Sequence, residues 1–385
     1  MDHRQLCSAA AAALAAVPAN HRPEVLVGFD GFIDAIIDVV ATRASTTSYT
    51  AMTTIGEYGQ RVLQAAGKSA NFELVVKQSK IGGNGPIMAN ALCSYDYAVT
   101  AIGVLGAGAI DPVFAPLAKR AKQVITLGPA GSTDALEFSD GKLMLGKVLP
   151  MEQVTYEHLL KTVGRDQLAA ILKRSPGVAT VNWTMTLGMT EIWNRLADEI
   201  LPGLRPDRPL WFVDLADPAK RTADDQRKGL AALTKLQKHV DVVLGMNEME
   251  LRQVLAALGK TWQAGDSEWE QARKGCEIVR DALGISWAMC HLVKSAAVAW
   301  TKTGASGSAA SDGFFDPKPK ITTGAGDHFN AGFLAALLAG IEPAHAIQIG
   351  GATSGHYVRT AESPSRAQVS AFLKQHAESG RATAR

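Results

Sequence analysis

The sequence predicts an α/β fold, in which a mostly parallel central β-sheet is covered by helices on both faces. Three observations support this class. Beyond residue 150, short apolar runs typical of buried strands alternate with longer stretches of helical spacing. The turns between them are short, which favours repeated strand–helix–strand units. The chain has 385 residues, of which 47% are apolar, so it can bury the large core that such a layered fold requires.

The elements expected in the first 150 residues are mostly strands. Residues 8–18 are rich in alanine and are expected to form a surface helix, because they lack the basic start and strongly apolar centre of a signal peptide. Strands are expected over 24–29, 33–40, 72–78 and 98–105, and a hairpin over 135–149 turns at Asp140-Gly141. The threonine- and serine-rich segment 41–54 is expected to interrupt this series of strands.

Helices and strands alternate in the second half of the chain. The expected helices cover 155–174, 187–199, 224–238, 247–258 and 267–284, and the expected strands cover 177–183, 209–215, 240–244 and 288–293. Ligands bind at the carboxyl ends of the strands in such sheets. Gly28, Asp214 and Asn247 all lie at or just beyond such ends, which places them near the expected site.

Composition limits the classes of partner. The formal charge of +2 and the lack of a basic cluster interleaved with aromatic residues argue against nucleic acid or an acidic membrane as a partner. No apolar run is long enough to cross a bilayer. The four cysteines are scattered along the chain, as expected for the reduced thiols of a cytoplasmic protein.

A glycine-rich loop followed by an apolar helix carries the clearest chemical signal. The loop is Thr322-Thr323-Gly324-Ala325-Gly326-Asp327, and residues 328–338 follow it as the helix. A helix that begins at such a loop presents unpaired N–H groups and the positive end of its dipole, which suits an anion. Asp327 adds a proton acceptor beside the anion, as phosphoryl transfer to a hydroxyl requires. On the local pattern alone, a glycine turn that caps a core helix explains these residues equally well.

Two other classes of nucleotide-binding protein fit less well. Gly103 to Gly108 offers two glycines of a dinucleotide-binding loop, but Asp111 occupies the position of the third, and Pro112 disfavours an immediate long helix. The sequence contains no Gly-x-x-x-x-Gly-Lys-Ser/Thr motif, which excludes the P-loop kinases.

Four ordered motifs resemble the signatures of the PfkB/ribokinase family of small-molecule kinases. They are Gly28–Asp34, Gly82–Leu92, Asn247–Glu250 and Thr322–Phe329, the last resembling the family pattern Asp-Thr-Thr-Gly-Ala-Gly-Asp-x-Phe. They occur in the family's order, at plausible separations, and the resemblance covers about residues 24–360. A single glycine motif would be weak evidence, whereas an ordered set of four is specific.

The resemblance implies a ribokinase-like three-layer α/β/α fold with a central, mostly parallel sheet and a small β-sheet lid. The implied division is an N-terminal helical extension over 1–23 and a kinase domain over 24–385. Lid strands are expected from about 32–54 and 95–149. The segment 41–80 is longer than expected between these family elements, so it either enlarges the lid or mediates contact between two copies.

The implied activity is phosphoryl transfer from ATP, with Mg²⁺, to a hydroxyl of a small molecule. Asp327 is expected to be the catalytic base. The N–H groups of the loop are expected to bind the transferring phosphoryl group; they are those of Gly324, Ala325 and Gly326. The residues expected to bind the acceptor are Asp30, Asp34, Gly82, Gly83 and Asn84.

The nucleotide side of the site is expected to include Thr322, Thr323, Lys294 and Asn247. Glu250 and Asn247, three residues apart on one helix face, are expected to hold Mg²⁺ through water; a helix cap followed by a solvated glutamate is the competing explanation. A solvated surface position competes with phosphate contact for Lys294. Ile321 stands where relatives often have an aspartate that helps to hold a monovalent cation, which puts potassium activation in doubt.

A monosaccharide is the favoured acceptor, and a nucleoside acceptor or a non-catalytic sensor of sugar or nucleotide are the alternatives. A phosphorylated acceptor would need basic residues near Asp34 or Gly83. Arg43, Lys77 and Lys80 are the candidates, but the sequence does not place them. The expected partners are therefore ATP and a small-molecule acceptor, with a possible homodimer formed through the lid.

Overall fold

The computed structural model describes residues 2–379, apart from 263–264, 266 and 303. Its main sheet has nine strands in the order β14-β13-β12-β11-β10-β9-β1-β5-β6. The strands are β1 (Glu24–Phe29), β5 (Ala98–Gly103), β6 (Gln123–Thr126), β9 (Gly177–Thr180), β10 (Leu210–Asp214), β11 (Asp241–Asn247), β12 (Trp287–His291), β13 (Ser295–Lys302) and β14 (Ala305–Asp312). The seven strands from β6 to β12 are parallel, and β13 and β14 are antiparallel. This confirms the predicted α/β class.

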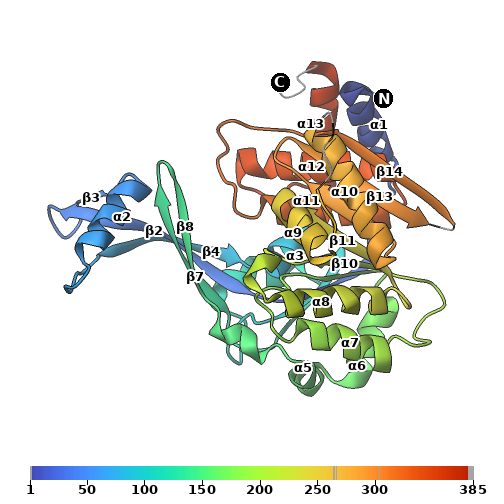
Figure 1. Cartoon of the computed structure of the whole chain (residues 1–385), viewed down its shortest axis with the longest axis horizontal. Helices are drawn as coiled ribbons and strands as arrows, with labels where there is room; N and C mark the ends of the chain where they lie inside the picture. Colours follow the sequence, from blue (N-terminus) through green and yellow to red (C-terminus); the bar gives the residue numbers. More distant parts are fainter. Residues whose placement is uncertain (1, 263–264, 266, 303, 380–385) are drawn as a thin grey trace.

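Helices cover both faces of the sheet (Figure 1). One face packs against α5 (Tyr156–Val163), α6 (Arg165–Arg174), α7 (Met189–Glu199), α8 (Ala223–Leu236), α9 (Glu248–Ala257) and α10 (Glu268–Leu283). The other packs against α1 (His3–Ala16), α3 (Asn84–Ser94), α4 (Ala115–Arg120), α11 (Ala325–Leu338), α12 (Pro343–Thr360) and α13 (Arg366–Ser379). Neighbouring strand residues enter opposite cores, as Trp211 and Phe212 of β10 do, because successive side chains point to opposite faces.

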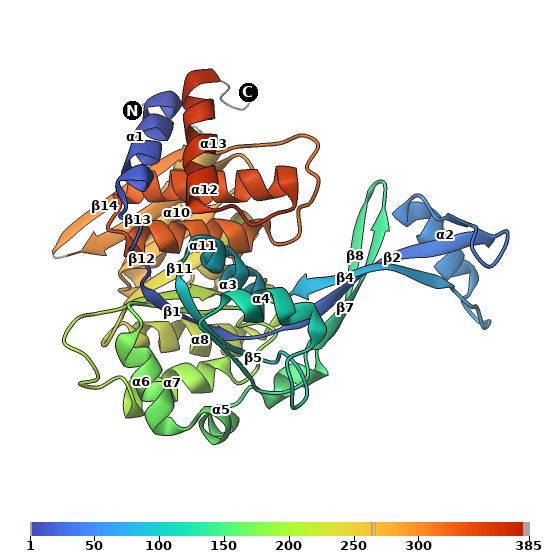
Figure 2. The same ribbon diagram turned by 180° about the vertical axis from the view of Figure 1, so that it is seen from behind.

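The N-terminal helix α1 lies beside the C-terminal helix α13 in both views (Figures 1 and 2). The Arg4 guanidinium donates to the carbonyl oxygen of Ala377 at 3.0 Å, and the Ser370 hydroxyl donates to that of Ala11 at 3.3 Å. The apolar side of α1, including Ala10 and Leu14, is buried in the same core as α11 and α12. The helix therefore packs onto the main body of the fold.

A second, five-stranded sheet projects from this body as a lid (Figures 1 and 2). It consists of β2 (Phe32–Arg43), β3 (Tyr49–Ala51), β4 (Leu74–Gly82), β7 (Gly131–Phe138) and β8 (Gly141–Lys147), with α2 (Ile55–Gln64) at its far end. A small core of Ile37, Val39, Met52 and Leu136 holds it together. The hairpin of β7 and β8 turns where Asp140-Gly141 predicted.

Three expectations differ from the observed elements. The lid range 95–149 is too wide, because β5 and β6 within it belong to the main sheet, while β4 joins the lid from outside both expected ranges. The segment 41–54 continues β2 to Arg43 and adds β3. The helix expected over 155–174 is divided into α5 and α6 at Gly164, whose φ of 87° lies in the left-handed region that ends helices.

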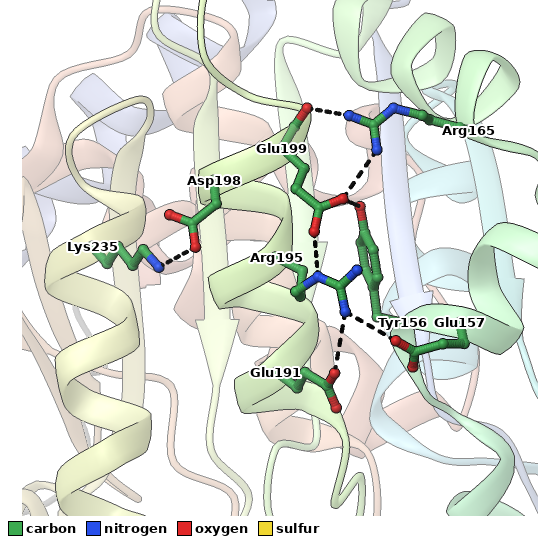
Figure 3. A network of polar contacts seen from close by, with 8 residues as sticks. All are labelled: Tyr156, Glu157, Arg165, Glu191, Arg195, Asp198, Glu199 and Lys235. Atoms are coloured by element: carbon green, nitrogen blue, oxygen red, sulfur yellow. Dashed lines mark hydrogen bonds and ion pairs between the residues drawn. The ribbon is translucent and has the colours of Figure 1, made fainter.

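Ion pairs connect the outer helices α5, α6, α7 and α8 (Figure 3). Arg195 contacts Glu157, Glu191 and Glu199, and Glu199 also accepts from Arg165 at 3.0 Å. On the neighbouring helix, Lys235 pairs with Asp198 at 2.6 Å. These side chains are largely solvated, so each pair contributes about 0–1 kcal/mol, and the buried apolar faces hold the layer in place.

Candidate active site

Two helix N-termini meet at the carboxyl edge of the sheet. The side-chain amide of Asn84, the first residue of α3, donates to Oδ1 of Asp327 in the first turn of α11 at 2.8 Å. The two residues are 243 positions apart in the sequence. This bond joins the expected acceptor residues to the expected base, and both helix dipoles favour negative charge there.

The glycine loop is held from behind by two aromatic side chains. Gly324 caps α11 with a φ of 89°. The Tyr357 hydroxyl donates to the carbonyl oxygen of Thr323 at 2.9 Å, and Nδ1 of His328 lies 2.7 Å from that of Gly324. The two rings stack with centroids 3.6 Å apart. The carbonyl groups of the loop are thus fixed towards the body, and in a trans peptide the following N–H points the opposite way.

The free donors of this loop differ from the expectation in one residue. The N–H of Ala325 donates to the carbonyl oxygen of Thr322 at 3.1 Å, which closes the turn, so Ala325 was wrongly expected to offer its N–H to a phosphoryl group. Among the described residues, the N–H groups of Gly324, Gly326 and Asp327 have no acceptor. These three donors remain available to an anion.

Asp327 is buried, with 7% of the residue exposed. Burial raises its pKa to about 8, with smaller contributions from the negative charges of Asp30, Glu250 and Asp34, and the hydrogen bond from Asn84 opposes the shift. A carboxylate with a raised pKa is a stronger base than an ordinary aspartate. The environment therefore suits proton abstraction near neutral pH.

Asp30 lies against the start of α3. Its carboxylate accepts from the N–H groups of Asn84 at 2.9 Å and Gly85 at 2.7 Å, and from the side-chain amide of Asn182 at 2.8 Å. Burial raises its pKa to about 6, and these three donors oppose the shift. Because its oxygens are occupied, Asp30 anchors the start of α3, whereas the sequence analysis had expected it to contact the acceptor.

Asp34 faces the space under the lid. In the lid sheet it lies opposite Lys80 of β4 and Thr133 of β7. Burial raises its pKa, and Thr133, Lys80 and Lys142 oppose the shift. A side chain at Gly82 would overlap the Asp34 carboxylate, so the glycine provides the room that this group occupies.

Asn247 and Glu250 form a capping box at the start of α9. Asn247 Oδ1 accepts from the N–H of Glu250 at 3.0 Å, and Glu250 accepts from the N–H groups of Asn247 at 2.8 Å and Asp217 at 2.9 Å. Glu250 is 5% exposed, which excludes a solvated surface position, and burial raises its pKa. Among the described residues, no group of three or more His, Cys, Asp or Glu is arranged to hold a metal ion directly.

Asp214 is a further buried carboxyl group, close enough to Glu250 and Asp327 to be affected by their charges. It ends β10, accepts from Asn330 Nδ2 and from the N–H of Ala216 at 2.8 Å each, and has a pKa raised well above its usual value by burial and by the charges of Glu250 and Asp327. The sequence indicated that Asp214 lies at the end of a strand. It did not indicate that the fold brings the charge of Asp327 close enough to raise the pKa of Asp214. Asn330, one helical turn after Asp327, was not anticipated.

Two cavities flank the loop that precedes α11, and both are bordered by Pro319 and Thr322. The first, of about 880 Å³, is lined by Asn247, His291, Phe314, Gly326, Phe329 and Ser354 among others. The second, of about 1170 Å³, lies between the lid face that carries Asp34 and the body. The loop thus separates a cavity on the side of the expected nucleotide residues from one under the lid.

The residues expected on the nucleotide side do not all lie at the same cavity. Asn247 and Thr322 line the 880 Å³ cavity, whereas Thr323 is turned to the lid, where Lys142 Nζ donates to its hydroxyl at 3.2 Å. Lys294 is absent from the described residues that line this cavity, and its ammonium lies 5.1 Å from the Phe315 ring, which argues against the expected phosphate contact. His291 lies against Gly326 instead, and burial lowers its pKa to about 4.

Comparisons with known proteins show which family the chain belongs to. A family model described as prokaryotic ketohexokinase matches residues 3–376. A ketohexokinase from Haloferax volcanii is 29% identical over 353 residues, which is 90% of each chain. Among solved structures, a carbohydrate kinase from Agrobacterium tumefaciens has a TM-score of 0.61 at 20% identity, covering 91% of this chain and 97% of that one. The Arabidopsis thaliana ribokinase complexed with ribose and ATP has a TM-score of 0.60 at 18% identity, covering 92% and 99%.

The three-layer body, the lid and the glycine loop define a carbohydrate kinase of the PfkB/ribokinase class, which transfers a phosphoryl group to a sugar hydroxyl. The match over residues 3–376 is more specific: the chain belongs to the prokaryotic ketohexokinase family. A nucleoside kinase and a non-catalytic sensor are not favoured. No helix within the described part of the chain is both long and apolar enough to span a membrane.

Proposed function

We propose that this protein phosphorylates a hydroxyl of a ketohexose, with ATP as the phosphoryl donor. The observation that carries the proposal is the bond between Asn84 and Asp327, beside a glycine loop that separates two cavities. The sugar would lie under the lid, against Asp34 and Asn84. The nucleotide would lie in the cavity lined by Asn247, His291 and Thr322.

In this arrangement, Asp327 takes the proton of the acceptor hydroxyl as that oxygen bonds to the γ-phosphorus. The bond from phosphorus to the bridging β–γ oxygen breaks, and ADP leaves with that oxygen. The free N–H groups of Gly324, Gly326 and Asp327 stabilise the charge of the transferring phosphoryl group. The start of α11 thereby supplies both the base and the anion site.

The charge distribution suits a hydrated Mg²⁺. The charges of Glu250 and Asp327 raise the pKa of Asp214, and the charge of Glu250 raises that of Asp327, so a cation near these carboxyl groups would relieve the repulsion. The oxygens of Glu250 already accept backbone N–H groups, which favours contact through water. When bound, Mg²⁺ neutralises charge on the phosphates. Ile321 lines the cavity under the lid and contributes no carboxylate for a monovalent cation.

The test is ADP release measured with a panel of ketohexoses, aldohexoses, pentoses, sugar acids and nucleosides, with Mg²⁺ and with or without potassium. We expect turnover to be fastest with a ketohexose and to be lost in Asp327→Asn. Faster turnover of a nucleoside or an aldose would contradict the proposed acceptor, and an equal rate for Asp327→Asn would contradict the proposed base.

We also propose that two copies associate through the lid in the cytoplasm. The lid exposes apolar side chains; Leu63 is 76% exposed and Val76 is 56% exposed. The four cysteines are free and buried, as suits a reducing compartment. Light scattering should give the mass of two chains for the wild type and of one for Val76→Glu. A single-chain mass for the wild type would contradict the association.

A further inference from the structure

The cavity under the lid is more basic than a neutral sugar requires. Its lining includes four basic side chains, on β4, α4, β8 and the loop before α11: Lys80, Arg120, Lys142 and Lys320. Two carboxylates, Glu137 and Glu362, also line it. The positive charges therefore come from both the lid and the body and face one space.

Lys80 and Lys142 form the inner pair. Both are half-buried and lie on the lid face that carries Asp34. Lys142 pairs with Glu137 at 2.9 Å and donates to the Thr323 hydroxyl at 3.2 Å. The side-chain ammonium of Lys80 has no hydrogen bond or ion pair with any described residue. Burial and the neighbouring Lys142 ammonium lower the pKa of Lys80, whereas Asp34 and Glu137 oppose the shift. Two ammonium groups are thus held close enough to repel each other.

Arg120 and Lys320 form the outer pair, at the exposed rim. Arg120 donates to the side chains of Asn90 and Ser94, and Lys320 donates to the carbonyl oxygen of Thr360 at 3.1 Å. Neither has a carboxylate partner within ion-pair distance among the described residues, so both charges are available to a ligand. By contrast, Lys77 and Lys147, on lid strands but outside the cavity, are paired with Asp38 at 3.3 Å and Asp134 at 2.7 Å.

We propose that this cavity binds the phosphate group of a monosaccharide phosphate, with Lys80 and Lys142 as its inner contacts and Arg120 and Lys320 at its rim. The inference rests on the proposed function. Asp34, opposite Lys80, would bind hydroxyls of the same sugar. A dianion between the two lysines would relieve their repulsion and form charge-assisted hydrogen bonds.

The position relative to the glycine loop links this site to the reaction. Lys142 of the lid contacts Thr323, the residue that precedes Gly324 of the glycine loop. The positively charged side chains of the lid are therefore next to the loop that would bind the transferring phosphoryl group. A sugar that has just received its phosphoryl group needs to move only from the loop towards Lys142 and Lys80. The site would therefore retain the product and make it an inhibitor that competes with the acceptor.

Isothermal titration of the full chain without nucleotide tests this, with fructose 1-phosphate, fructose 6-phosphate, inorganic phosphate and fructose as the probes. Lys80→Gln should weaken binding of the tighter sugar phosphate by about tenfold or more and change fructose binding by less than about threefold. Lys77→Gln, on the same strand but outside the cavity, is the matched control and should behave like the wild type. Raising the salt concentration should weaken sugar phosphate binding in the wild type more than in Lys80→Gln.

Unchanged sugar phosphate affinity in Lys80→Gln would overturn the proposal, and so would inorganic phosphate binding as tightly as either sugar phosphate. Circular dichroism of each variant verifies that the fold is retained, and Lys142→Gln provides a second variant should Lys80→Gln not fold. Because no turnover is measured, the two proposals fail separately. A Lys80-dependent affinity in a protein that is inactive on ketohexoses would contradict only the proposed reaction.

Discussion

Asn84 donates its side-chain amide to Asp327 across 243 residues of sequence, and this one bond joins the N-termini of α3 and α11. It holds the carboxylate of Asp327 through its Oδ1 atom. The backbone N–H of Asn84 is itself anchored by Asp30 at 2.9 Å. The proposed base is therefore positioned by an anchored chain of hydrogen bonds.

The replacement Asp327→Asn should lower kcat by about 10²–10⁴-fold, because it removes the proton acceptor while keeping the shape of the side chain. The dissociation constant of ATP should change little, since the loop N–H groups remain. Single-turnover kinetics and nucleotide titration measure the two quantities. A kcat within about threefold of the wild type would show that Asp327 is not the base.

The raised pKa of Asp327 also predicts the pH dependence of the reaction. The base must be deprotonated, and its pKa is about 8 in the free protein. We therefore expect kcat/KM for the acceptor to rise with pH through the neutral range and to level off above about pH 8. Initial rates between pH 6 and 9, with a pH-independent coupling system, measure this. An activity that is flat from pH 6 upwards would require an ordinary, low pKa.

The same shift has a consequence for stability. A carboxyl group whose pKa is raised on folding favours the folded state most at low pH, and this contribution is lost as the pH rises towards the folded pKa. For Asp327 that window extends from about pH 4 to about pH 8. Asp327→Asn should thus equal the wild type in stability near pH 4 and exceed it by a few kcal/mol at pH 8. Urea unfolding at both pH values tests this, and equal stability at pH 8 would contradict it.

Part of this site can be predicted from the sequence, because it is formed by residues that are neighbours in the chain. The Gly324–Asp327 loop, the Asn247–Glu250 pair and the Gly82–Asn84 turn each occupy a few consecutive residues, so their geometry follows from glycine freedom and helix capping. The parallel sheet follows from the alternation of strands and helices.

The remaining features depend on contacts between distant segments. Asp30 differs from Asp34 only because its oxygens meet the start of α3 and Asn182, and Lys80 becomes part of a cavity only because β4 pairs with β2. Ala325 loses its free N–H to the turn with Thr322, which depends on backbone angles rather than residue type. Tertiary placement decides these roles, and no short motif records it.

The close approach of Gly82 to the Asp34 carboxylate predicts that a larger residue at position 82 weakens acceptor binding but not nucleotide binding. In Gly82→Ala, the new methyl group would overlap the Asp34 carboxylate and displace it. The acceptor KM should rise about tenfold or more, while the KM for ATP changes little, because the proposed nucleotide cavity lies on the other side of the glycine loop. Gly59→Ala in α2, where a side chain meets nothing within 4 Å, is the control. An unchanged acceptor KM would remove Asp34 from the acceptor site.

Tyr357 provides the sharpest test of how the glycine loop is held. Its hydroxyl donates to the Thr323 carbonyl oxygen at 2.9 Å, so Tyr357→Phe frees that peptide to rotate and misplaces the N–H of Gly324. We expect kcat to fall about tenfold, the effect of one lost hydrogen bond of about 1 kcal/mol or slightly more, with the acceptor KM within about twofold. Tyr97→Phe is the matched control: its hydroxyl donates at 2.7 Å to the carbonyl oxygen of Ala335, which lies twelve residues beyond Thr323. It should lower stability by a similar amount but leave kcat unchanged. If both variants lose the same activity, the effect of Tyr357 is general packing of α11; if only Tyr357→Phe does, the loop carbonyl is the point at which it acts.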